Sequence, residues 1–395
     1  MTTIARYLAV PAFLAVSTTL GACTGSTSSS GVEGNTVKIG LSVTLSGPLA
    51  SSGSATECGV RAYLDAINAN GGIEGYKFDI TSKDNQYDPA VAAGVARDLA
   101  SEGVFAVVTS GTATTQASVP VLKARGIPVL GSLDGGLVSP PKWEGEFGYF
   151  PSYEKDGSSA ATFIREELKE DSASVVYFSP PGDPNSHGFE TTFEDSGGTL
   201  AANEALAPDV TDFSALAQKL KKAGAPVVYA AVVDTQLAGL QKAADAIGYD
   251  PQWVSWTLAQ GPTYQNLAGD LAEGVYFSQW ATSETETDDP AVQDYLDAVG
   301  KVKGCEDRTA EALVKSGYAQ GAMIAYAVEQ IVSDGDDPTP AGLIDVLGKV
   351  TDQQFGLTPH VTFDDDSHAG VRQDSYWKVV DGQLELVRDF APLPN

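Results

Sequence analysis

The chain has 395 residues and a formal net charge of −28, with 43% hydrophobic and 19% charged residues. This length is too great for one ordinary hydrophobic core and enough for two domains, and the hydrophobic content predicts a folded globule. The negative charge argues against nucleic acid and against electrostatic docking on anionic lipid, because phosphate groups would be repelled. An acidic, soluble surface is the simplest interpretation.

The N-terminal segment is typical of an export signal. Arg6 is its one charged residue, and the apolar stretch from Tyr7 to Leu20 is too short for a comfortable membrane span. It leads into Leu20-Gly21-Ala22-Cys23, which resembles the bacterial lipobox, where the cysteine is lipidated and becomes the new N-terminus. We predict a signal peptide over residues 1–22, lipidation at Cys23 and a flexible tether over residues 23–35. An ordinary cleaved signal with an incidental cysteine is the alternative.

A strand–helix–strand–helix pattern follows. Residues 37–43 are apolar at nearly every position, as in a strand buried on both faces. Residues 59–70 have the spacing of an amphipathic helix, which ends at Gly71-Gly72. Residues 77–83 form the second expected strand, and Asp88-Pro89 is typical of the N-cap and first residue of another helix.

Three pieces of this region are specific in combination: Ser46-Gly47-Pro48, the run Ala66–Ile73, and Asp84 through Asp88-Pro89. Together they resemble the start of the branched-chain amino-acid-binding (Leu/Ile/Val-binding) family of ABC-transporter substrate-binding lipoproteins. The resemblance implies the type I periplasmic-binding fold, an α/β architecture of two doubly wound parallel-sheet lobes. In this family three crossovers join the lobes, which close on a small solute.

Strands and helices keep alternating along the rest of the chain, which is typical of doubly wound parallel sheets. The first crossover is expected in the Gly- and Pro-rich residues 131–152, and the second in the acidic residues 281–289. Residues 376–387 predict a closing hairpin, which by the resemblance lies on the second lobe. The expected division is 36–152 plus 283–362 for the first lobe and 153–282 plus 363–395 for the second.

Cys58 and Cys305 remain as an even pair in an exported, oxidising setting. A disulfide between them and two separate buried thiols are both open. The chain has no Cys-x-x-Cys motif, and its three histidines are not at metal-ligand spacing with one another. We therefore expect no metal and no cofactor.

Ligands of open parallel sheets bind beyond the carboxyl ends of the strands, so the candidate binding residues follow the predicted strands. In the first lobe they are Ser52, Thr112, Ala113, Thr114, Leu133, Asp134 and Gly135. The stretch around Thr112 resembles the family's Ser/Thr-rich loop, which holds the solute's carboxylate; hydroxyls and free N–H groups at a helix start suit an anion. A plain helix cap is the alternative. Asp134 departs from the family and either pairs with a ligand ammonium or binds its own backbone in a turn. Ser52 falls where the family often has an aromatic lid residue.

In the second lobe the candidates are His187, Val232, Asp234, Trp256 and Thr257. Thr257 stands where amino-acid binders of the family typically have a Glu for the α-ammonium, and a hydroxyl cannot balance a buried cation. Either Asp134 or Asp234 takes that role, or the ligand is not an α-amino acid. Trp256 can form an apolar wall, and His187 is either a ligand contact or a surface histidine.

The sequence lacks the nucleophile elbow, the phosphate-binding loop and the dinucleotide-binding motif, so we do not expect an enzyme. We expect a monomeric, extracytoplasmic lipoprotein that binds a small carboxylate- or carbonyl-bearing solute and presents it to an ABC permease in the membrane. A sensory module that reports to a membrane signalling partner is the alternative.

Overall fold

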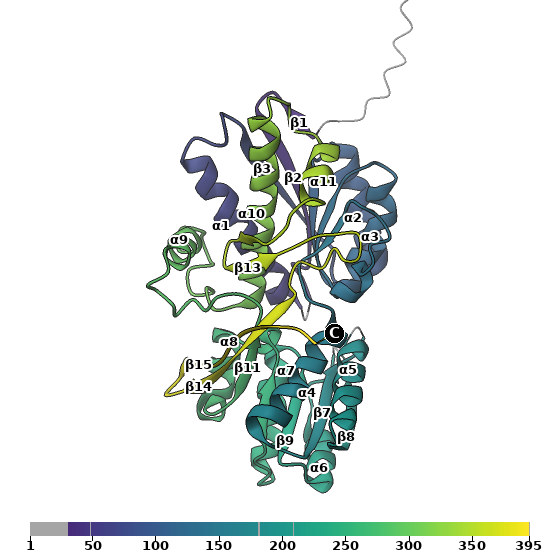
Figure 1. The fold of residues 1–395 in the computed structure, drawn as a ribbon, viewed down its shortest axis with the longest axis vertical. Coiled ribbons are helices and arrows are strands. Elements are labelled where there is room, and N and C mark those ends of the chain that lie inside the picture. Colours follow the sequence, from purple (N-terminus) through teal and green to yellow (C-terminus); the bar gives the residue numbers. More distant parts are fainter. Residues whose placement is uncertain (1–30, 48, 181, 208, 395) are drawn as a thin grey trace, which may run out of the picture.

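The computed structural model describes residues 31–47, 49–180, 182–207 and 209–394. The predicted signal peptide (1–22), the lipidation site Cys23 and the tether up to residue 30 lie outside the described residues. In the described part the chain forms two lobes stacked along the long axis of the molecule (Figure 1).

The first lobe contains a six-stranded sheet. Its elements are β1 (Val32–Glu33), β2 (Thr36–Val43), α1 (Ala50–Ala69), β3 (Lys77–Asp84), α2 (Pro89–Glu102), β4 (Ala106–Ser110), α3 (Thr112–Lys123), β5 (Val129–Ser132) and β6 (Glu146–Gly148). Strands β2 to β6 pair in parallel, whereas β1 pairs with β2 antiparallel. Strand β1 falls within the segment predicted as tether, so the end of that segment belongs to the sheet.

The second lobe contains a seven-stranded sheet in the order β15-β14-β11-β10-β9-β7-β8. Its elements are α4 (Tyr153–Phe163), a π-helical turn (Ile164–Leu168), β7 (Ser172–Phe178), α5 (Asp183–Asp195), β8 (Thr199–Leu206), α6 (Ser214–Ala223), β9 (Val227–Ala231), α7 (Asp234–Ala246), β10 (Gln252–Ser255), α8 (Pro262–Ala268) and β11 (Tyr276–Gln279). The hairpin β14 (Gln373–Val380) and β15 (Gln383–Pro392) joins this sheet through β11, so its predicted place on the second lobe is confirmed.

Between the two parts of the second lobe the chain returns to the first. It forms α9 (Pro290–Val299), α10 (Ala312–Ser333), α11 (Pro340–Leu347) and the small hairpin β12 (Gln353–Phe355) and β13 (Thr358–Val361). Within the described residues the chain thus passes between the lobes three times, after β6, after β11 and after β13 (Figure 1). The predicted fold class is confirmed; the residue limits of the two lobes stay a prediction.

Helices α1 and α10 pack closely because glycines face each other across the contact. A Cβ on Gly59 would lie 2.0 Å from the carbonyl oxygen of Val314, and one on Gly317 would lie 2.1 Å from that of Thr56. Only residues without a side chain allow two backbones to approach this closely. The contact fixes α10, a late part of the sequence, on the first lobe.

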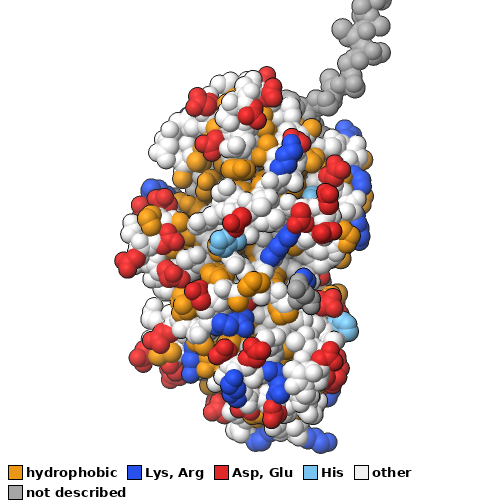
Figure 2. Space-filling view, in the orientation of Figure 1, with side chains coloured by type: hydrophobic (Ala, Val, Ile, Leu, Met, Phe, Trp, Pro, Cys, Tyr) orange, Lys and Arg blue, Asp and Glu red, His pale blue; other side chains and the backbone are white. Residues whose placement is uncertain are grey.

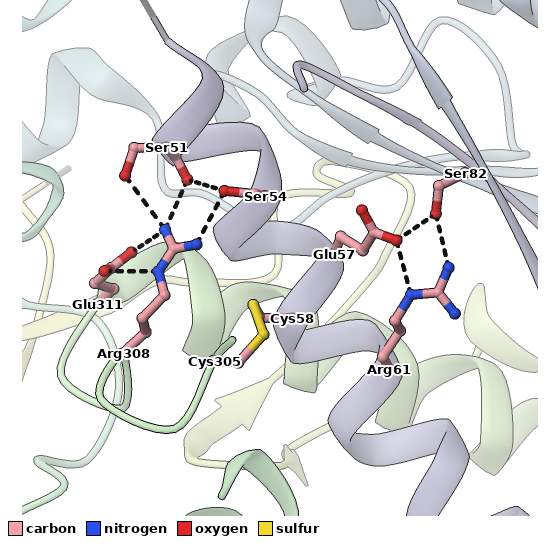
Figure 3. The surroundings of a disulfide bond; sticks show 9 residues. All are labelled: Ser51, Ser54, Glu57, Cys58, Arg61, Ser82, Cys305, Arg308 and Glu311. Carbon is pink, nitrogen blue, oxygen red and sulfur yellow. Dashed lines mark hydrogen bonds and ion pairs between the residues drawn. A yellow bond between two sulfur atoms is a disulfide. The ribbon is translucent and has the colours of Figure 1, made fainter. Parts of the chain in front are cut away.

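A disulfide joins Cys58 of α1 to Cys305, in the segment between α9 and α10, with Cα atoms 5.9 Å apart (Figure 3). Of the two alternatives that the sequence left open, the disulfide is the one observed. It ties the chain that leads into α10 to the first helix of the lobe.

Acidic side chains are spread over both lobes on the face shown in Figure 2, with Lys and Arg between them. None of the described helices is both long and apolar enough to cross a membrane.

Candidate functional site

A cavity lies where the carboxyl ends of strands from both sheets face each other. Its empty volume is about 640 Å³, including the part open to solvent. From the first lobe Thr44, Tyr87, Ser110, Gly111, Thr112 and Ser132 line it, and from the second Phe178, Val233, Trp256 and Leu258. Each of these follows or ends a strand, as the strand-end rule for parallel sheets requires.

The base of the cavity is aromatic. Phe150 and Tyr153, from the first crossover and the start of α4, line it together with Trp256. The Tyr153 and Trp256 rings are 5.3 Å apart between centroids. Trp256 is 2% exposed, and its Nε1–H donates to the carbonyl oxygen of Val232 at 2.6 Å. This hydrogen bond fixes the indole against the cavity and places Val232 behind it.

The start of α3 supplies the polar end. Gly111, at φ +94°, precedes the helix, and among the described residues no side chain caps it. The first N–H groups of a helix have no partner within it, so they and the helix dipole favour an anion at Thr112. The Thr114 hydroxyl donates to the carbonyl oxygen of Ser110 at 2.6 Å and therefore serves the turn. Ala113 is exposed and lies outside the cavity lining.

Tyr87 covers this helix start. A Cβ on Gly111 would lie 2.6 Å from Cε2 of Tyr87, so the ring packs directly on the glycine. Gln86 and Tyr87 both have positive φ values, +55° and +54°. Such strained backbone gathers at ligand sites, where the surroundings hold it in place.

Leu133, Asp134 and Gly135 lie behind the cavity wall and do not line it. The Asp134 carboxylate accepts hydrogen bonds from the backbone N–H groups of Gly136 at 2.9 Å and Tyr153 at 2.8 Å. Burial raises the pKa of this carboxyl. The geometry is that of the turn, and the backbone N–H of Asp134 also donates to Thr112 Oγ1 at 3.2 Å, which positions that hydroxyl.

The remaining candidates of the second lobe, His187, Thr257 and Asp234, lie outside the cavity lining. His187 is exposed, with Nε2 4.0 Å from Glu154 Oε1, and is not part of the cavity lining. Thr257 is 1% exposed and turns toward Gln279, whose Oε1 accepts from its hydroxyl at 3.3 Å, and toward Lys315, away from the cavity. Asp234 lines a smaller hollow beside the cavity.

The structure thus brings Ser52, Thr112 and Trp256 together at the cavity and adds residues that the strand-end reasoning missed. Phe150 comes from the first crossover, Tyr153 from the start of α4 and Leu313 from the start of α10. The aromatic run near residue 150 was visible in the sequence, but Leu313 had no signal. Among the described residues that line the cavity none is charged. The described residues also hold no group of three or more His, Cys, Asp or Glu placed for a metal ion.

Two doubly wound lobes around a cavity at facing strand ends define the class of two-lobed solute-binding proteins. Residues 36–382 match the periplasmic binding protein family, and the chain belongs to that family. Membership implies an extracytoplasmic location and agrees with the prediction of a binding protein rather than an enzyme.

Similar proteins support the predicted relationship. The chain is 26% identical to Leu/Ile/Val-binding protein homolog 3 of Brucella melitensis, over 77% of this chain and 82% of the relative. It is 26% identical to Leu/Ile/Val-binding protein BraC3 of Rhizobium johnstonii, over 81% and 90%.

Solved structures share the fold. The fatty acid ABC transporter substrate-binding protein of Thermomonospora curvata matches with a TM-score of 0.81 at 20% identity, over 92% of this chain and 94% of that one. The isoleucine-bound branched-chain amino acid transporter substrate binding protein of Streptococcus pneumoniae matches with a TM-score of 0.77 at 24% identity, over 90% and 100%. At these identities the likeness carries the fold alone.

Proposed function

We propose that this protein is the solute-binding component of an ABC importer, held at the membrane by a lipid on Cys23, and that it binds a small carboxylate with an apolar body. One observation carries the proposal: the cavity joins the uncapped start of α3, which suits an anion, to an aromatic base without charged side chains.

Residues of both lobes contribute to this cavity, so a solute there contacts both. A solute that makes more contacts when the lobes are together favours the closed state by that difference, and the three crossovers serve as the hinge. The closed form is the one presented to the permease.

Of the proteins named above, two carry Leu/Ile/Val-binding names, one has isoleucine bound, and one is a fatty acid ABC transporter substrate-binding protein. For this chain we propose a ligand that has a carboxylate but no α-ammonium group. No carboxylate side chain lines the cavity among the described residues, and Thr257 faces elsewhere. Leaving an ammonium unpaired in such a site would cost several kcal/mol.

The test is a thermal-melt and calorimetric titration with leucine, 4-methylpentanoate (leucine without its ammonium) and hexanoate. A ligand at 1,000 times its Kd adds about 4 kcal/mol to the folded state, which moves the melting temperature visibly. We expect 4-methylpentanoate to bind more tightly than leucine. Tighter leucine binding would contradict the carboxylate class, and silence of every acid and amino acid would contradict solute binding.

Two variants separate the cavity from the surface. Trp256→Ala removes part of the cavity's aromatic base and should weaken 4-methylpentanoate binding roughly 30-fold or more, since a buried aromatic ring contributes about 2 kcal/mol or more. His187→Ala removes an exposed side chain and should leave the affinity unchanged. Uptake of the bound acid by cells, lost on deletion of the protein, distinguishes an importer component from a sensory module.

A further inference from the structure

A second hollow adjoins the cavity, and we call it the annex. It is lined by Asp234, Gln260 and Thr263 of the second lobe and by Ser51 and Glu311 at the edge of the first. Ser52, Leu258 and Leu313 line both the annex and the cavity, so the two are adjacent and share these residues as a common wall. Thr112, Ser110 and Gly111 line the cavity but not the annex, so the start of α3 is not part of the annex wall.

Gln260 is the unusual residue of the annex. It is 5% exposed, and neither its side-chain oxygen nor its side-chain nitrogen has a hydrogen-bond partner among the described residues. Leaving a buried amide unpaired is destabilising, so such groups normally have a partner, whether protein, water or ligand. An amide that lines a hollow beside a solute cavity is placed to meet a polar group of the solute.

The charges around the annex do not balance. Glu311 accepts from Arg308 Nε at 2.9 Å and Nη2 at 2.6 Å, and Arg308 also donates to the Ser51 carbonyl at 2.7 Å and to Ser54 Oγ at 2.9 Å (Figure 3). This guanidinium is therefore committed to Glu311 and to the start of α1. Among the described residues Asp234 has no cation within ion-pair distance.

The contacts of Asp234 agree with a carboxylate that lacks a positive partner. Its Oδ1 accepts from the backbone N–H of Thr235 at 2.7 Å. Burial raises the pKa of this carboxyl, the Glu311 charge raises it further and Arg308 lowers it. A half-buried carboxylate gains most from a partner that brings a positive charge with it.

We propose that the annex binds a primary ammonium group at the end of the solute away from its carboxylate, with Asp234 as the ion partner and Gln260 as a hydrogen-bond acceptor. The proposal rests on the proposed function, since the solute's carboxylate must occupy the start of α3. It narrows the solute class to carboxylates that carry a distal amine beyond an apolar segment. The length of the apolar segment is set by the residues that the cavity and the annex share.

The experiment compares 6-aminohexanoate with hexanoate by calorimetric titration, so that the two probes differ in the distal amine alone. In the unmodified protein 6-aminohexanoate should bind roughly tenfold more tightly, as expected for a charge-assisted hydrogen bond. Asp234→Asn should bring the ratio of the two Kd values close to one and leave the hexanoate Kd nearly unchanged.

Two further variants make the result specific. Asp245→Asn removes an exposed carboxylate from the same helix, α7, and should preserve the tenfold ratio. Gln260→Leu replaces the unpaired amide with an apolar group of similar size, which the fold should tolerate. It should lower the ratio by removing the acceptor, so the proposal stays testable even if Asp234→Asn fails to fold.

Equal binding of the two probes by the unmodified protein, or an equal loss of both in Asp234→Asn, would overturn the annex proposal. If neither probe binds but 4-methylpentanoate does, the annex proposal fails while the proposed function stands. If no small solute stabilises the protein, the proposed function fails and the annex proposal with it.

Discussion

The disulfide between Cys58 and Cys305 should contribute strongly to the free energy of unfolding. Cys58 and Cys305 are 247 residues apart in the chain, so reducing the bond releases a very long loop in the unfolded state. The chain-entropy relation gives about 5.5 kcal/mol for a loop of this length at 25 °C, slightly above the measured range of disulfide contributions, which ends at about 5 kcal/mol. We therefore expect reduction to lower the free energy of unfolding by up to about 5 kcal/mol.

The assay is urea unfolding with and without a reductant, in a protein whose Cys23 is replaced by Ser so that one thiol pair remains. The double variant Cys58→Ala/Cys305→Ala serves as the control, because it should not respond to the reductant and should resemble the reduced protein. The denaturant slope, which scales with the surface exposed on unfolding, should be the same for the reduced protein and for the double variant.

A loss below about 1 kcal/mol would refute the chain-entropy argument. The segment around Cys305 would then be held by its other contacts. Chief among these are the hydrogen bonds of Arg308 to Ser51 and Glu311.

Three other predictions test separate parts of the structure. Burial raises the pKa of Asp156 to about 7, above the value of this carboxyl in the unfolded chain. The unfolded chain therefore loses this proton first, and the free energy of unfolding should fall as the pH rises from about 4 to about 7. Asp156→Asn should flatten this fall in urea titrations, and an unchanged slope would count against the prediction. Gly111→Ala should weaken hexanoate binding, because the added Cβ would collide with the Tyr87 ring. Gly126 also has a positive φ but lies in open space, so Gly126→Ala should lower the free energy of unfolding by about 1 kcal/mol without changing the Kd for hexanoate. Lys315→Met should lower the free energy of unfolding by about 3–5 kcal/mol, because it leaves Glu284 without the partner that lies 2.7 Å away. Adding Glu284→Gln should restore most of this loss in thermal or urea unfolding. A Lys315→Met variant as stable as the unmodified protein would show that the ion pair contributes little.

The alternation of strands and helices was predictable because apolar periodicity reports burial directly. Asp88 is an example of a local rule that holds, since its carboxylate accepts from the N–H groups of Ala90 at 2.7 Å and Val91 at 3.0 Å. The predicted start of α1 was wrong by nine residues, because the helix begins at Ala50 and not at Gly59. The Ser-, Gly- and Thr-rich stretch 50–58 has no apolar periodicity, yet small residues such as Gly53 are what allow the helix to lie against Thr44.

The site was predictable as a place more than as a set of side chains. Strand ends located Thr112 and Trp256 at the cavity, but neighbouring Thr257 points the other way, since the turn of the backbone after a strand is set by tertiary packing. Leu313 reaches the cavity from a helix about 200 residues after Thr112, and no local pattern reports such a meeting.

The place of α10 in the chain has a consequence for biosynthesis. The residues that cover one face of α1 and that oxidise with Cys58 are made only after nearly all of the second lobe. A polypeptide that emerges N-terminus first therefore carries an incomplete first lobe, with an unpaired thiol, while the second lobe is still being delivered. Contacts between such distant segments form late and slowly, so strands β7 to β11 of the second lobe can pair before α10 completes the first, although the hairpin β14–β15 joins them later still. Until α10 is made, the face of α1 that it covers stays exposed, and this is the surface that chaperones would protect.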